Sequence, residues 1–101
     1  MKIVTFCDID DSIFDSKHDI EHFQSGSSGD AQIAILDIDT IFDFEENKSN
    51  ACDENYVSIA VLEDDSDYEA FKNFGIDAWI KTEDLEHIGG LINLVEKRNF
   101  A

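Results

Sequence analysis

Four short apolar stretches of the chain predict buried β-strands, at residues 2–7, 31–37, 56–62 and 77–81. Three of the four are rich in β-branched residues, and none alternates regularly with polar residues. Continuous apolar runs of this length are typical of strands that are covered on both faces, as they are in parallel sheets. The pattern therefore predicts a small parallel sheet.

Two helices are predicted in the second half of the chain. The first begins near Ser66, which has Glu69 at the spacing of a capping box, and Gly75 ends it. The second has Thr82 as its N-cap, and its apolar residues then recur at helical spacing. Residues 56–100 should therefore run strand, helix, strand, helix, a unit that is right-handed by default.

The remaining segments have weaker patterns. Residues 12–23 place their apolar side chains at spacings that fit one helix, and residues 25–30 (SGSSGD) are expected to form a loop. Residues 42–55 contain two phenylalanines but no helical stripe, so we expect an irregular connection or a single turn there. Together these elements predict one doubly wound α/β domain over residues 1–101, with four or five parallel strands.

The whole chain is acidic, with 24 acidic against 7 basic residues and a net charge of −17. Binding to nucleic acid is not expected, because phosphate contacts need clustered Lys and Arg, and binding to anionic membranes is not expected either. The charge suits a basic protein partner, cation binding, a salt-rich environment or a mimic of nucleic acid. Charge alone does not choose among these four.

Cys7 and Cys52 are too few and too far apart to indicate a disulfide framework or a zinc site. We expect two free thiols in a reducing compartment. No apolar run is long enough to span a membrane, and the first residues (MKIVTF) are strand-like rather than typical of a signal peptide. The sequence therefore predicts a cytoplasmic protein.

Acidic residues follow three of the four predicted strands. An acid–Ile–acid motif occurs at residues 8–10 and again at 37–39, and residues 63–65 form a third acidic cluster. The carboxyl ends of parallel strands lie along one edge of the sheet, where ligands bind. Carboxylates gathered there would suit Mg²⁺, although aspartate also forms turns and helix caps where strands end. Both interpretations remain open at this point.

These residues resemble the receiver domains of bacterial two-component signalling, the CheY-like domains. IAILDID is similar to the strand that ends in the phosphoacceptor of the family, which maps onto Asp37. KIVTFCDID resembles the first strand and the acidic pair that helps to hold Mg²⁺, and GIDAWIK stands where the family has Gly, an aromatic residue and Lys. The resemblance implies a flavodoxin-like fold, a phosphoacceptor-like position at Asp37, and Asp8, Asp10 and Asp37 as metal ligands.

Several positions depart from the motifs of that family. Cys7 replaces one metal-binding acid, and Leu62 or Glu63 stands in place of the hydroxyl residue that binds the phosphoryl group. Lys81 falls one residue early, and Glu83 replaces the proline that follows the lysine. The chain is also short between the first and third strands. We therefore expect a degenerate receiver that is shortened between strands one and three. It should require no cofactor, and Mg²⁺ is the metal ion that its acidic residues could bind.

A phosphatase is the alternative hypothesis. DIDDSIFDS resembles the first motif of haloacid-dehalogenase-type phosphatases, with Asp8 as nucleophile and Asp10 as general acid/base. Asp64 and Asp65 would correspond to the metal-binding acids of that family. The chain is short for such an enzyme, and no lysine has a suitable setting. An acidic nucleic-acid mimic is a third hypothesis, and it depends on charge alone.

The sequence thus favours an atypical receiver-like domain that acts through protein–protein interaction, without enzymatic activity of its own. Such a domain often leads a longer protein. The partner is expected to be a protein, basic in character, with a homodimer as a second option and no nucleic acid or membrane. The predicted interaction surface consists of Phe71, Trp79, Ile88 and Leu91.

Overall fold

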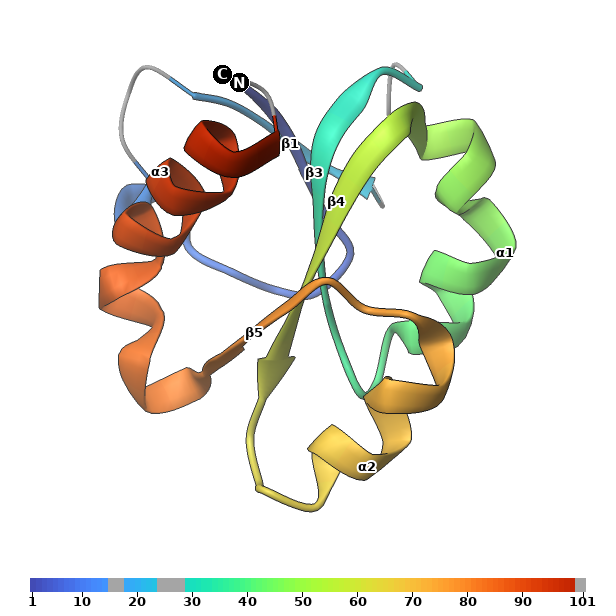
Figure 1. Ribbon diagram of the computed structural model, residues 1–101, viewed down its shortest axis with the longest axis vertical. Coiled ribbons are helices and arrows are strands. Elements are labelled where there is room, and N and C mark those ends of the chain that lie inside the picture. The colour runs from blue at the N-terminus through green and yellow to red at the C-terminus, as the bar shows by residue number, and fades with distance from the viewer. Residues whose placement is uncertain (15–17, 24–28, 100–101) are drawn as a thin grey trace.

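The computed structural model describes residues 1–14, 18–23 and 29–99 and contains a five-stranded sheet between two helical layers (Figure 1). All neighbouring strands pair in parallel, in the order β2-β1-β3-β4-β5. This is the strand order of flavodoxin-like folds, so the predicted fold class is confirmed. The strands are β1 (Lys2–Thr5), β2 (Asp19–His22), β3 (Ala31–Asp37), β4 (Cys52–Leu62) and β5 (Ala78–Lys81).

Three α-helices are found in the described part of the chain: α1 (Ile41–Ala51), α2 (Asp67–Phe71) and α3 (Ile88–Asn99). In Figure 1, α1 and α2 lie on one side of the sheet and α3 lies on the other. A 3-10 turn, Lys72–Phe74, continues α2 as far as Gly75, which adopts a φ of 67° and ends the segment as predicted. Within the same residues, no helix is both long and apolar enough to cross a lipid bilayer.

The sheet separates two apolar cores. Ile33 and Ile35 of β3 face the core beneath α3, whereas Ala34 and Leu36 face the core beneath α1 and α2. All four side chains are fully buried. Because both faces of the central strands are covered, their sequences are apolar throughout, which is why they were recognisable as strands of a parallel sheet.

The predicted helix over residues 12–23 is wrong. A 3-10 turn occupies Asp11–Ile13, and β2 pairs with β1 so that Ile20 lies beside Ile3. Ile20 packs on the α3 side and Phe23 on the α1/α2 side, although on a helix residues three apart would share a face. Residues 15–17 of this prediction, and residues 25–28 of the loop predicted at 25–30, lie outside the described part of the chain.

The irregular connection predicted for residues 42–55 is also wrong, because helix α1 and the first residues of β4 occupy it. The helix buries Ile41, Phe44 and Ala51, and Lys48 stands between Phe44 and Ala51 on the same stripe. The Lys48 ammonium lies 5.8 Å from the centre of the Phe44 ring, and its aliphatic stem can cover apolar surface. A lysine within the buried stripe explains why the pattern was not recognised as helical.

The predicted shortening between strands one and three is confirmed, and all five strands are present; no α-helix occurs between β1 and β3 in the described residues 6–14, 18–23 and 29–30. Only residues 23–30 join β2 to β3, whereas a helical crossover needs about a dozen residues or more. Phe6, which follows β1, stacks on Phe23 with ring centres 4.5 Å apart and meets the edge of Phe44 at 5.6 Å. Aromatic side chains therefore contribute to the cover of the sheet beside β1.

Candidate functional site

The two acid–Ile–acid motifs are anchored by their isoleucines. Ile9 is buried on the α3 side of the sheet, between the exposed Asp8 and Asp10. Ile38 is partly buried against the core on the α1/α2 side. Because β1 and β3 are adjacent and parallel, both motifs lie at the same edge of the sheet, as the sequence predicted.

The carboxylate of Asp37 is bound to Thr40. Asp37 Oδ1 accepts hydrogen bonds from the Thr40 backbone N–H, at 3.0 Å, and from the Thr40 hydroxyl, at 2.8 Å. The Asp37 backbone N–H donates in return to Thr40 Oγ1, at 3.0 Å. These bonds close the turn that leads from β3 into α1, so the predicted phosphoacceptor position forms a turn and a helix start.

The Asp37–Thr40 pair should contribute to stability through hydrogen bonding rather than charge. We expect Asp37→Ala to lower the free energy of unfolding by about 1 kcal/mol, because the Thr40 N–H and hydroxyl lose their acceptor. Asp37→Asn keeps an acceptor oxygen and should cost less. Denaturant unfolding of both variants tests this expectation, which would be contradicted if asparagine were as damaging as alanine.

Cys7 is the residue that the resemblance to receiver domains matches with a metal-binding acid. Burial of its side chain, together with the negative charges of Asp37 and Asp8, raises the pKa of the thiol to about 12. The thiol is therefore protonated at neutral pH. A neutral sulfur atom is a poor ligand for a hard cation such as Mg²⁺, so this position cannot replace the missing carboxylate.

The predicted metal ligands do not form a metal-binding group. Asp10 turns back on its own loop, where Oδ1 accepts a hydrogen bond from the Ser12 N–H at 3.0 Å, and this bond lowers the pKa of Asp10. Asp37 is engaged by Thr40, as described above. No set of three or more His, Cys, Asp or Glu side chains is placed to hold a metal ion in residues 1–14, 18–23 and 29–99.

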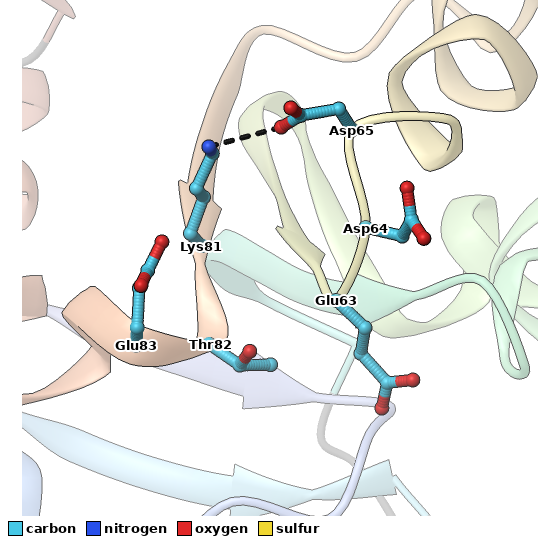
Figure 2. Close-up of a pocket in the computed structure, with 6 residues that line it drawn as sticks. All are labelled: Glu63, Asp64, Asp65, Lys81, Thr82 and Glu83. Carbon is cyan, nitrogen blue, oxygen red and sulfur yellow. Dashed lines mark ion pairs between the residues drawn. The ribbon is translucent and has the colours of Figure 1, made fainter.

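A second acidic region lies where β4 and β5 end. Figure 2 shows a pocket of about 330 Å³ that combines four carboxylates with one lysine and one threonine. Lys81 Nζ forms an ion pair with Asp65 Oδ1 at 2.9 Å, so this lysine is engaged by the loop after β4. The pocket is lined by Glu63, Asp64, Asp65, Lys81, Thr82 and Glu83.

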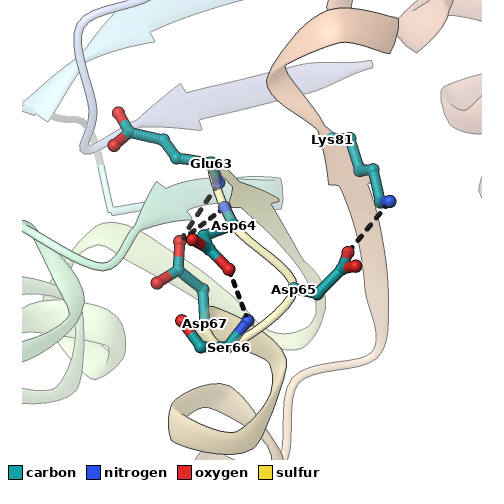
Figure 3. A network of polar contacts seen from close by, with 6 residues as sticks. All are labelled: Glu63, Asp64, Asp65, Ser66, Asp67 and Lys81. Carbon is teal, nitrogen blue, oxygen red and sulfur yellow. Dashed lines mark hydrogen bonds and ion pairs between the residues drawn. The ribbon is translucent and has the colours of Figure 1, made fainter.

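The loop between β4 and α2 is held by its own aspartates (Figure 3). Asp67 Oδ2 accepts hydrogen bonds from the backbone N–H groups of Glu63, at 3.1 Å, and Asp64, at 3.3 Å. Asp64 Oδ1 accepts one from the Ser66 N–H at 3.0 Å, which lowers the pKa of Asp64. The predicted capping box is therefore wrong, because Ser66 makes no side-chain cap. The Asp-x-Ser spacing of an Asx turn was the sequence feature that could have revealed this arrangement.

The predicted interaction surface is partly wrong. Phe71 and Ile88 are both 0% exposed and pack in the two cores. The helical spacing that singled them out marks the buried face of each helix, not an exposed one. Trp79 and Leu91 are half-buried, and the Trp79 ring lies 5.1 Å from that of Tyr68. The exposed large apolar side chains in the described part of the chain are instead Phe42, Tyr68 and Leu94.

Comparison with known proteins gave no relative. No protein-family model, no curated protein and no solved structure matches this chain. The functional argument must therefore come from the geometry of the chain itself.

Proposed function

We propose that this chain is a receiver-like regulatory domain that acts through contact with a partner protein and is not switched by phosphorylation of Asp37. The flavodoxin-like strand order supports the comparison with receivers, as does the position of Asp37 at the end of the central strand β3. The observation that carries the second half of the proposal is the double hydrogen bond from Thr40 to Asp37 Oδ1.

A phosphoryl group on Asp37 would lack the partners that it needs. Its oxygens require cations or strong hydrogen-bond donors nearby. Lys81 pairs with Asp65, Cys7 is a neutral buried thiol, and the loop that follows β4 begins with the carboxylate of Glu63. The surroundings of Asp37 therefore favour a structural carboxylate.

The charge of the domain supports a basic protein as its partner. Among the described residues, four lysines form ion pairs with acids of the chain, so the acids without such a pair are left to attract a partner. A net charge of −17 attracts a basic surface and speeds encounter with it. These four lysines are Lys2, Lys48, Lys72 and Lys81.

Incubation with acetyl phosphate and Mg²⁺ tests the proposal, with intact-mass spectrometry as the readout. We expect no phosphorylated species that depends on Asp37, and so no difference between the wild-type domain and Asp37→Asn. A phosphorylated form in high yield that disappears in Asp37→Asn would overturn the proposal. Hydrolysis of p-nitrophenyl phosphate that requires Mg²⁺ and is lost in Asp8→Asn would support a phosphatase instead.

A further inference from the structure

An exposed phenylalanine, Phe42, pairs with the partly buried Phe74 on the side of the sheet that carries α1 and α2. Phe42, in the first turn of α1, is 71% exposed, the largest exposed fraction among the large apolar side chains described. Its ring meets the edge of the Phe74 ring, with centres 6.4 Å apart and planes at 84°. Phe74 ends the 3-10 turn after α2, so the ring contact joins this turn to α1.

The exposure of Phe42 contrasts with the burial of neighbouring phenylalanines. Phe44, two residues along the same helix, is 2% exposed, and Phe71 is fully buried. Phe74 packs partly against the core and holds the Phe42 ring from one side. An exposed aromatic ring held in place loses little conformational freedom on binding, which is a property of interface anchors.

The surroundings of the Phe42–Phe74 pair are acidic. Asp43 follows Phe42 directly, and Glu46 stands one helical turn beyond it on the same face; both are exposed. The nearby lysines of these segments are already paired, Lys48 with Glu45 and Lys72 with Glu69. A second copy of the chain would bring a further charge of −17 to this surface, so charge opposes self-association here and favours a basic partner.

We propose that the Phe42–Phe74 pair is a docking site for a basic segment of a partner protein. An apolar side chain of that segment packs against the two rings, and its Lys or Arg residues meet Asp43 and Glu46. The proposal rests on the proposed function and gives it a surface and a class of partner.

Selection from a displayed library of random short peptides tests this site. We expect the selected peptides to combine Lys or Arg with a large apolar residue. Phe42→Ser should weaken their binding about tenfold or more, as removal of an interface anchor does. The double variant Asp43→Asn, Glu46→Gln should also weaken binding and reduce its dependence on salt. Because Phe42, Asp43 and Glu46 are exposed, neither variant should disturb the fold.

Leu94→Ser is the matched control, because Leu94 is 46% exposed on α3, on the opposite side of the sheet. It should change affinity by less than about twofold. Equal affinity for wild type and Phe42→Ser, or selected peptides without basic residues, would overturn the docking site. If the peptides lost affinity only for the Leu94→Ser variant, the docking site at Phe42 would be wrong. The proposed function, binding to a partner protein, would still stand. If the library yields no binder, both proposals fail.

Discussion

Replacement of Phe44 by alanine is expected to lower the free energy of unfolding by about 3–5 kcal/mol. The Phe44 side chain is 2% exposed, and its ring meets Phe6 at 5.6 Å and Tyr56 at 6.0 Å between centres. It thus ties α1 to the residue that follows β1 and to β4. A domain of this size is stable by only about 5–15 kcal/mol in total, so the variant should lose a large part of its stability.

Denaturant unfolding measures this loss, and Phe42→Ala is the control. Phe42 lies on the same helix but is 71% exposed, so its removal should change the free energy of unfolding by no more than about 0.5 kcal/mol. A similar loss in both variants would contradict the described packing of α1.

The second large effect is expected at Gly29. This residue has a φ of 81°, which L side chains rarely adopt, and an added Cβ would lie 2.7 Å from the backbone oxygen of Asn50. Gly29→Ala must therefore strain the backbone before β3 and displace the end of α1. We expect it to lower the free energy of unfolding by about 2 kcal/mol or more.

Gly90→Ala offers a matched comparison within α3. A Cβ there would meet open space, and alanine has a higher helix propensity than glycine. The free energy of unfolding of this variant should therefore rise by up to about 1 kcal/mol. Thermal melts of the two variants should therefore shift in opposite directions. A Gly29→Ala variant as stable as the wild type would show that the backbone at Gly29 lies farther from Asn50, at the end of α1, than described.

The central strands were predictable from the sequence because both of their faces are buried. β3 has the predicted bounds, Ala31–Asp37, and β4 contains the predicted 56–62 but begins at Cys52. β2 could not be predicted, since it is a short edge strand in which only Ile20 is apolar. Its strand conformation depends on pairing with β1, which no local pattern reveals.

The candidate site was predictable in its position but not in its geometry. Parallel pairing brings the acidic strand ends to one edge, as the motifs indicated. Whether a carboxylate faces outward or binds its own turn depends on local backbone geometry, which brings Thr40 within 2.8 Å of Asp37 Oδ1. Helical spacing likewise placed Phe71 on the apolar face of one helix and Ile88 on the apolar face of another, but both faces are buried.

The central claim is that Asp37 is a structural carboxylate, and NMR tests it most directly. The isotope-labelled domain is titrated with Mg²⁺ and then with beryllofluoride, which imitates an aspartyl phosphate. We expect no saturable shifts at Asp8 or Asp37, and no change at the Trp79 indole. Saturable Mg²⁺ shifts at both aspartates, followed by beryllofluoride shifts that spread to Trp79, would contradict the claim and identify a working phosphorylation switch.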